Sequence, residues 1–416
     1  MTILVLNSGS SSQKACLYEI GETLPVHPPG CLWEGKIEWS GDTALTVVKN
    51  SKGVVERCRL TANSRAQVLE DLLRTSWSGP TRAIESASEI GAVGHRVVHG
   101  GPRFEDPVVI TPAVRAAIAS VAPFAPLHVC AALEGMEMAG NLLGSTPQMA
   151  VFDTGFHRQM PAAAATYAGP YQWFERGIRR YGFHGINHQY CTERAAQLLG
   201  KDKTSLKLVI CHLGNGCSIT AVQQGRSVDT TMGFTPLDGL MMGTRSGAVD
   251  PGILTFLLRQ DQLDSQKLDK LLNLESGLLG ISGISGDMRD ILAAIQQGHK
   301  RAKLAFDIYV HRLRLAIGGM GAAMGGIDAL AFTAGVGENS PEVRAAACST
   351  MGFLGVKLDD QKNARPILDC DISSVDSPVR VLAIRAEEDW VIASECWKLA
   401  QAGAPAGQET TGNKIS

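Results

Sequence analysis

Apolar residues among the first twenty positions form two short runs separated by a turn of small polar residues. The first run is Ile3–Leu6, the turn is Asn7–Ser12, and a second strand-like run is Gln13–Ile20. Short apolar runs on both sides of a Gly/Ser turn are typical of a β-hairpin. These residues are therefore expected to form a strand, a turn and a second strand.

The same pattern returns about half a chain later. Leu208–Cys211 leads into the turn His212–Gly216, and the strand-like run Cys217–Val222 follows. At an offset of 205 residues, Asn7 corresponds to His212. Two hairpins of one design predict a duplicated architecture, although chance similarity between two common hairpins would give the same pattern.

Helical and strand-like periodicities alternate along the chain. Apolar residues recur at helical spacing in the segments 62–76, 187–199, 254–273, 287–297 and 299–318. Short β-rich runs occur at 91–98, 148–152, 328–333 and 379–384, and a helix-like stretch follows at 386–401. Strands that alternate with helices are typical of α/β layers.

Composition limits the number of domains and the kind of partner. A chain of 416 residues predicts two or three domains. The net charge of −2 gives no reason to expect nucleic acid or an anionic membrane as a partner. No apolar stretch reaches the ~18 residues of a membrane helix, and no positive charge precedes the first apolar run as it would in a signal peptide.

The ten cysteines are scattered without CxxC pairs. A chain of this size does not need disulfides to hold its fold, so we expect reduced thiols in a cytoplasmic protein. Cys16, Cys130 and Cys211 are expected to behave as small buried apolar residues.

Three turns rich in small residues could bind an anion. They are Asn7–Ser12, His212–Gly216 and Gly335–Asn339. Such turns offer backbone N–H groups, and glycine allows close approach of a ligand. Ser340 and Pro341 are expected to be the N-cap and first residue of a helix after the third turn. Each turn alone could be a solvated loop and no GxxxxGK[ST] motif is present, but the three together favour a nucleotide in a cleft between two domains.

Four charged or titratable side chains lie in apolar or Gly-rich surroundings: Arg96, Asp153, His184 and Arg245. Two arginines, a histidine and a carboxylate suit phosphoryl transfer, because cations stabilise the equatorial oxygens and a carboxylate orients metal, water or nucleophile. A structural ion pair or a surface loop is the alternative for each. No HExxH, GxSxG or C₂H₂ pattern occurs, and His184 with His188 is not expected to bind a metal.

The motifs, in their order, resemble the acetokinase family within the actin-like and sugar-kinase superfamily, from about Ile3 to Ala393. The matching segments are Asn-Ser-Gly-Ser-Ser-Ser (7–12), Gly-His-Arg-Val-Val-His-Gly-Gly (94–101), Phe-Asp-Thr-Gly-Phe-His (152–157), Arg-Tyr-Gly-Phe-His-Gly (180–185), His-Leu-Gly-Asn-Gly (212–216), Met-Gly-Thr-Arg-Ser-Gly (242–247), Asp-Met-Arg (287–289), Gly-Val-Gly-Glu-Asn-Ser (335–340) and Glu-Glu (387–388). The chain departs from the family pattern at Ile186-Asn187, Val129-Cys130, Ala248 and Arg385-Ala386.

The resemblance implies a role for each matching residue. Asn7 and Glu387 would place Mg²⁺, for which Mn²⁺ could substitute, mostly through its waters. Arg96 would bind the substrate carboxylate, Asp153 would lie near the transferred phosphoryl group, and His184 and Arg245 would stabilise the transition state. The residues implied to hold ATP or ADP are Lys14, His212, Leu213, Gly214, Asn215, Gly216, Asp287, Met288, Arg289, Gly335, Val336, Gly337, Glu338 and Asn339. Those implied to line the pocket for the alkyl end of the substrate are Val98, Leu127, Phe183 and Pro236.

The resemblance also implies a fold of two duplicated actin-like (ribonuclease H-like) α/β domains with an interdomain cleft. The first domain would span 1–152 and carry the C-terminal helix 387–400. The second would span 153–386, bind the nucleotide and form the dimer interface. Residues 401–416 are expected to be a disordered tail.

The implied activity is reversible, Mg²⁺-dependent phosphoryl transfer from ATP to acetate, giving acetyl phosphate and ADP, in a homodimer. Propionate or butyrate as substrate is the nearest alternative, because one methylene changes discrimination by only ~1–3 kcal/mol. A pyrophosphate-dependent enzyme and a non-catalytic, nucleotide-gated binding protein on the same fold are further alternatives.

Overall fold

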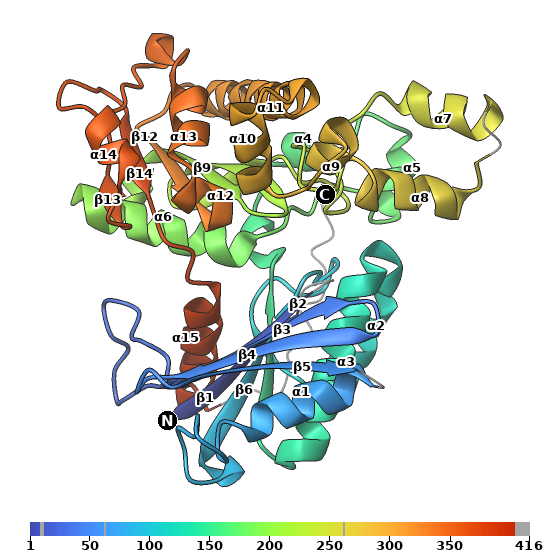
Figure 1. Ribbon diagram of the computed structural model, residues 1–416, viewed down its shortest axis with the longest axis vertical. Helices are drawn as coiled ribbons and strands as arrows, with labels where there is room; N and C mark the ends of the chain where they lie inside the picture. Colours follow the sequence, from blue (N-terminus) through green and yellow to red (C-terminus); the bar gives the residue numbers. More distant parts are fainter. Residues whose placement is uncertain (9–11, 62–63, 261–262, 404–416) are drawn as a thin grey trace. The chain divides into compact units, whose positions relative to one another are not determined.

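The computed structural model describes residues 1–8, 12–61, 64–260 and 263–403. Contacts within the chain divide it into two compact mixed α/β units, which Figure 1 shows. Unit 1 holds Met1–Gly155 with the described chain from Glu387 onward, and unit 2 holds Phe156–Ala386. Of the tail expected to be disordered, residues 404–416 lie outside the described residues. Within the described ranges, no helix has both the length and the apolar character needed to span a lipid bilayer.

Unit 1 is built on an eight-stranded sheet with the order β5-β4-β3-β2-β1-β6-β8-β7. Its strands are β1 (Thr2–Ser8), β2 (Ser12–Glu19), β3 (Trp33–Ser40), β4 (Thr43–Asn50), β5 (Val55–Thr61), β6 (Ile90–Val97), β7 (Val108–Val109) and β8 (Gln148–Phe152). The hairpin expected over the first twenty residues is confirmed by β1 and β2, where Asn7 lies opposite Lys14. Strands β1, β6 and β8 are parallel neighbours, so their carboxyl ends meet at one edge of the sheet.

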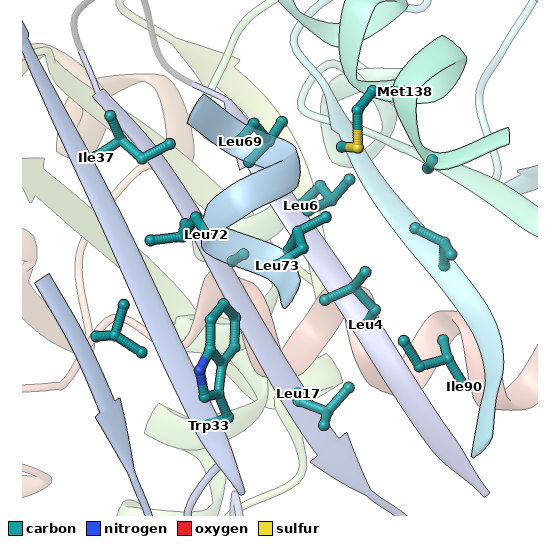
Figure 2. Close-up of a cluster of buried hydrophobic side chains, with 14 of the residues drawn as sticks. Leu4, Leu6, Leu17, Trp33, Ile37, Leu69, Leu72, Leu73, Ile90 and Met138 are labelled. Carbon is teal, nitrogen blue, oxygen red and sulfur yellow. The ribbon is translucent and has the colours of Figure 1, made fainter. Parts of the chain in front are cut away.

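Helices cover both faces of this sheet. They are α1 (Arg65–Arg74), α2 (Pro112–Ser120), α3 (Pro126–Leu143) and α15 (Glu388–Gln401), with short 3₁₀ helices η1 (Ala87–Glu89) and η2 (Ala122–Phe124). Figure 2 shows the core under α1, where Leu69, Leu72 and Leu73 of the helix belong to one apolar cluster with Leu4 of β1 and Trp33 of β3. The helical spacing of these leucines gives α1 one apolar side, which explains why it lies on the sheet.

Helix α15 returns to the opposite face of the same sheet and packs against β1 and β6. The contact depends on Gly94 of β6. A Cβ at this position would lie 2.6 Å from Sγ of Cys396 and 2.6 Å from Cγ2 of Ile392, both on α15. Glycine therefore allows the last described helix to approach the strands closely.

Unit 2 repeats the arrangement of strands on a six-stranded sheet. Its strands are β9 (Lys207–Leu213), β10 (Cys217–Gln223), β11 (Arg226–Thr230), β12 (Ala329–Thr333), β13 (Cys370–Asp371) and β14 (Arg380–Ala383), in the order β11-β10-β9-β12-β14-β13. This is the order β3-β2-β1-β6-β8-β7 of unit 1, with the same parallel and antiparallel neighbours. The predicted duplication is confirmed. The second hairpin turn is one residue shorter, because His212 lies opposite Ser218.

The helices of unit 2 also lie on both sides of its sheet. They are α4 (Ala162–Ala165), α5 (Tyr171–Glu175), α6 (Gly185–Leu199), α7 (Pro251–Gln260), α8 (Ser265–Leu274), α9 (Gly277–Ser282), α10 (Met288–Gln296), α11 (Lys300–Met324), α12 (Ala334–Asn339), α13 (Pro341–Cys348) and α14 (Asp360–Ala364), with 3₁₀ turns η3 (Gly155–His157), η4 (Lys203–Ser205) and η5 (Gly352–Leu354). Helix α6 packs against β9 and β12, and α11 packs against β9 and β10. Helix α13 begins at Pro341 after the N-cap Ser340, as predicted.

Several local expectations were wrong. The single helix predicted over 254–273 is two helices, α7 and α8, with residues 261–262 outside the described part. The turn predicted at 335–339 is helix α12, and Cys130 is exposed on α3. Strands β3 to β5 were not predicted, although the alternation of Trp33 and Ile37 with charged residues is a clear strand signal.

Gly94→Ala is expected to lower the free energy of unfolding by about 1–3 kcal/mol, because the new methyl group must displace Ile392 and Cys396. Urea unfolding measures the change. The control is Gly91→Ala in the same strand, where a Cβ would meet the flexible side chain of Met1 at 3.2 Å. Equal losses in the two variants would show that the approach of α15 does not depend on Gly94.

Candidate active site

In unit 1, three of the side chains singled out in the sequence meet where parallel strands end. Asn7 lies near the end of β1, Arg96 near the end of β6, and Asp153 directly follows β8. Adjacent parallel strands present their carboxyl ends at the same edge, which is where open α/β sheets bind ligands. The topology therefore brings these three residues together although up to 146 positions separate them in the sequence.

Arg96 and Asp153 form an ion pair that is largely withdrawn from water. Nε of Arg96 lies 3.1 Å from both carboxylate oxygens of Asp153, and Nη2 lies 2.6 Å from Oδ2. Asp153 is only 1% exposed. Burial lowers the pKa of Arg96, but Asp153, Glu388 and Asp389 together raise it by more, so the guanidinium stays charged. The remaining nitrogen, Nη1, donates to Oδ1 of Asn7 at 3.1 Å and lies 3.4 Å from Oε2 of Glu388.

Two acidic residues of this site were not predicted: Glu388 and Asp389 in the first turn of α15. Asp389 accepts a hydrogen bond from Nδ2 of Asn7 at 2.9 Å and pairs with Nζ of Lys14 at 2.8 Å. Burial lowers the pKa of Lys14, but Asp389, Cys16 and Glu34 together raise it by more, so Lys14 also stays charged. The predicted metal residue, Glu387, is the N-cap residue of α15. Three consecutive acids at the start of a helix are a signal that could have identified this group from the sequence.

The donor atoms in unit 1 fit a hard, hydrated cation better than a dehydrated one. Glu387, Glu388, Asp389, Asp153 and Asn7 offer oxygen atoms, which Mg²⁺ prefers, and Mg²⁺ needs only one or two carboxylates because it keeps several waters. Within the described residues, no group of three His, Cys, Asp or Glu side chains is arranged to hold a metal by itself. Arg96 and Lys14 share the same carboxylates.

In unit 2, the turn His212–Gly216 joins β9 to β10, and Leu213 is the last residue of β9. His184 precedes α6 with a φ of 59°, in the left-handed region. Its ring stacks on the ring of His212 with centroids 3.9 Å apart and planes 10° apart. Two parallel imidazoles at this separation disfavour a positive charge on both rings at once.

Glycine at position 216 leaves room beside two potential donors. A Cβ on Gly216 would lie 3.3 Å from Nε2 of His184 and 3.6 Å from Nη1 of Arg245. A Cβ on Gly214 would lie 3.6 Å from Nε2 of His212. The nitrogen edges of the two histidines and of Arg245 therefore lie along one turn, as binding an anion requires.

Arg245 differs from Arg96 in its partners. Its Nη1 donates to the carbonyl oxygen of Pro236 at 3.3 Å, and within the described chain it forms no ion pair with a carboxylate. Burial lowers the pKa of Arg245 because it disfavours the charged form. A half-buried guanidinium without a carboxylate partner gains free energy when an anion binds to it.

The nucleotide motifs lie on two helices of unit 2. Gly335, Val336, Gly337, Glu338 and Asn339 belong to α12. The side chain of Arg344, which is fully buried, donates to the carbonyl oxygens of Gly337 at 2.7 Å and Glu338 at 2.8 Å, and so holds the end of α12. Sequence reasoning missed this residue.

Asp287–Arg289 lies at the start of α10. Asp287 caps the helix by accepting the backbone N–H of Arg289 at 2.8 Å, and the two side chains form an ion pair at 2.5 Å. Met288 between them is buried.

The loop at Gly243 lies close to two other segments. A Cβ on Gly243 would lie 2.4 Å from Oδ1 of Asn215 and 2.9 Å from the carbonyl oxygen of Gly286. The loop before Arg245 therefore links the start of α10 to the turn His212–Gly216.

The four residues predicted to line the substrate pocket divide between the units. Val98, buried directly after β6, and Leu127, in the first turn of α3, belong to unit 1. Phe183 and Pro236 belong to unit 2, where Phe183 is buried beside His184 and its carbonyl oxygen accepts a hydrogen bond from Nε2 of His157 at 3.1 Å.

The pH dependence of stability tests whether His157, which donates to the carbonyl oxygen of Phe183, is buried as a neutral ring. Burial lowers the pKa of His157 to about 4, against about 6.5 in an unfolded chain. Between these values the unfolded chain binds a proton that the folded protein does not, so stability is complete above pH ~6.5 and is lost as the pH falls toward 4. His157→Gln, which keeps a donor for Phe183, is expected to reduce this slope by about 1.4 kcal/mol per pH unit between about pH 4.5 and 6.

Urea unfolding across this pH range measures the slope. The control His311→Gln, at an exposed position of α11, should leave the slope as it is in the parent protein. An unchanged slope in the His157 variant would mean that this ring takes up its proton equally in the folded and unfolded states.

Known proteins are similar to this chain over nearly its whole length. The sequence model of the acetokinase family matches residues 2–394. The acetate kinase of Gloeobacter violaceus is 57% identical over 402 residues, which cover 96% of this chain and 99% of that protein. The crystal structure of Porphyromonas gingivalis acetate kinase gives a TM-score of 0.87 at 39% identity, with 96% of this chain and 99% of that chain covered. A propionate kinase from Francisella tularensis also gives 0.87, at 37% identity with 95% and 99% covered.

Proposed function

This chain belongs to the acetokinase family, and from that premise we propose that it transfers a phosphoryl group reversibly between ATP and acetate, giving ADP and acetyl phosphate. The observation that carries the proposal is Arg245, a half-buried cation without a carboxylate partner in the described chain, beside His184 and the glycine turn 212–216. This arrangement suits a transferring phosphoryl group, whose charge lies on three equatorial oxygens.

The chemistry needs little proton transfer. A carboxylate has a pKa of about 4 and is already ionised at neutral pH, so no strong general base is required to make it a nucleophile. The main barrier is the approach of one anion to another. Arg245 and His184 lower it by offering N–H donors to the phosphoryl oxygens, and Asp153 acts by positioning Arg96 more than by accepting a proton.

Arg96 is proposed to bind the carboxylate of the acyl substrate. Nε and Nη2 are engaged with Asp153, whereas Nη1 contacts a neutral amide oxygen of Asn7 and a more distant oxygen of Glu388. Nη1 is therefore the atom that can exchange its present partners for acetate. Val98, Leu127, Phe183 and Pro236 are proposed to surround the methyl group.

The nucleotide is proposed to lie on unit 2, with its phosphates near the turn 212–216 and its adenosine near α12 and Asp287–Arg289. Lys14 of unit 1 would contribute a further positive charge to the phosphates. A divalent cation, Mg²⁺ with Mn²⁺ as a substitute, would be held by Asn7 and Glu387 together with Glu388, and when bound it neutralises phosphate charge. Asp389 holds Asn7 in place by accepting a hydrogen bond from its side-chain amide.

Trapping with hydroxylamine tests the activity, because hydroxylamine converts an acyl phosphate into a coloured hydroxamate. The protein with MgATP is incubated separately with acetate, propionate and butyrate, and the strongest signal is expected with acetate. A stronger signal with propionate would keep the mechanism and change the substrate, as the name of the Francisella relative suggests for that protein. Bound nucleotide without hydroxamate from any acid would refute the kinase and favour a non-catalytic binding protein.

Arg245→Ala supplies the residue-level control for this assay. By analogy with arginine fingers, its loss is expected to lower kcat by about 10³–10⁵. Arg312→Ala removes an arginine from an exposed position of α11 and should leave kcat unchanged.

We also propose that the protein is a homodimer formed through unit 2. Helix α7 has no buried side chain, and Ile253, Phe256 and Leu258 are 48%, 60% and 41% exposed. Leu274 at the end of α8 is also exposed. Several large apolar side chains at the surface of neighbouring helices are typical of a contact with another protein.

Phe256→Asp with Ile253→Asp is expected to convert the dimer to a monomer, because dimerisation would bury two carboxylates in an apolar contact. Sedimentation velocity measures the molecular mass. The control is Phe353→Asp, which changes a more exposed apolar residue of η5, outside the proposed contact, and should leave the mass unchanged. A dimer that persists in the double variant would place the contact elsewhere.

A further inference from the structure

The hydroxyl group of Ser218 lies between two imidazole rings in unit 2. Oγ is 2.9 Å from Nδ1 of His184 and 2.7 Å from Nε2 of His188. His184 and His188 are one helical turn apart, since the backbone N–H of His188 donates to the carbonyl oxygen of His184. Ser218 comes from β10, and α6 packs by its apolar side on the neighbouring strands β9 and β12 of the same sheet. His188 and Ser218 are completely buried.

The hydrogen atoms of this chain of contacts can be assigned from His188. Burial lowers the pKa of His188 well below its ordinary value, with smaller contributions from His157 and His212, so the ring is neutral. Its Nδ1 is buried and has no hydrogen-bond partner among the described residues. An orphaned N–H inside a protein is rarer than an orphaned acceptor. The proton of His188 therefore belongs on Nε2, where Ser218 accepts it.

This assignment determines the next two hydrogen atoms. Because Oγ of Ser218 accepts from His188, its own hydrogen is available for the other contact, and it donates to Nδ1 of His184. An acceptor at Nδ1 means that a neutral His184 carries its proton on Nε2. Nε2 is the atom beside Gly216 and Arg245.

We propose that His188 is a positioning residue which, through the hydroxyl of Ser218, holds His184 in the Nε2–H tautomer and so presents an N–H donor to the transferred phosphoryl group. The inference rests on the proposed function for the identity of the group that His184 meets. The opposite tautomer would direct a lone pair at phosphoryl oxygens, which repels them.

The neighbouring ring is controlled in the same way. Nδ2 of Asn187 lies 2.8 Å from Nδ1 of His212, and an amide nitrogen can only donate. A neutral His212 therefore also carries its proton on Nε2, beside Gly214. Oδ1 of the same amide accepts from Sγ of Cys191 at 3.7 Å, which agrees with this orientation of Asn187. The stacked pair thus presents two N–H donors along the glycine turn.

The decisive variant is Ser218→Ala, which removes the link and leaves both rings in place. Nitrogen-15 NMR of histidine-labelled protein reports the tautomer of His184 without substrate, because the two ring nitrogens resonate far apart and exchange positions when the tautomer changes. The His184 signals are identified by their loss in His184→Gln. The parent protein is expected to show the Nε2–H form, and Ser218→Ala a mixture of both forms.

Kinetics supply the second readout. Ser218→Ala is expected to lower kcat by about 10- to 100-fold, the usual effect of removing an outer hydrogen-bond partner, with little change in KM for acetate. The control is Thr220→Val, two residues along β10. It removes an equally buried hydroxyl that contacts Oγ1 of Thr230 at 3.0 Å and should change neither the tautomer nor kcat.

His188 itself is tested with two substitutions. His188→Gln keeps a donor near the position of Nε2 and should retain most of the Nε2–H form and of kcat, whereas His188→Leu should lose both. If His188→Leu does not fold, Ser218→Ala and His188→Gln still decide the matter.

A pure Nε2–H signal and parental kcat in Ser218→Ala would overturn the proposal. If the parent protein makes no acyl phosphate from any acid, the proposed function fails, whereas the NMR result still shows whether the relay sets the tautomer. The two failures are therefore distinguishable.

Discussion

Parallel pairing of the central strands is the constraint on which the charged cluster of unit 1 depends. In unit 1, backbone hydrogen bonds hold β1 and β6 in a register in which Leu6 lies opposite His95. One residue farther along each strand, Oδ1 of Asn7 accepts from Nη1 of Arg96. Because side chains alternate between faces, a slip of one residue would turn Arg96 away from Asp153 and expose the apolar side of the strand. The apolar core and the charged site are thus set by the same register.

The two units balance their partly buried positive charges differently. In unit 1, Arg96 and Lys14 are neutralised by carboxylates of the same unit, so removing one partner would leave a costly unpaired charge. In unit 2, Arg245 relies on a backbone carbonyl and a nearby thioether sulfur within the described chain. The cations Arg96 and Lys14 of unit 1 are therefore already paired with carboxylates, whereas Arg245 of unit 2 gains free energy when an anion binds to it. This difference is expected if unit 2 is the one that binds phosphate.

The sequence was most informative where structure depends on local pattern. The two hairpins, the strands that alternate with helices and the N-cap at Ser340 follow from short-range periodicity and turn chemistry, and the motifs singled out Arg96 and Arg245 as candidates. Contacts made only in the folded chain could not be predicted in this way. Asn7 and Asp389 are 382 residues apart, and they meet only because α15 packs on the first sheet. The paired contacts of Ser218 likewise need α6 to pack on the sheet that contains β10, and the residues of one strand do not predict which helix will cover it.

The return of α15 to the first strands has a consequence for biosynthesis. The ribosome synthesises β1 and β6 early. Asp389 and Glu388, which pair with Lys14 and Arg96, follow more than two hundred residues after Asp153. At roughly 5–20 residues per second, the nascent unit waits on the order of tens of seconds with the sheet face that α15 covers still exposed. A chain truncated before Glu388 would lack both the helix and its acids. Unit 1 can therefore be completed only after translation has passed α15. Aborted chains expose an apolar surface that quality-control proteases and chaperones can recognise.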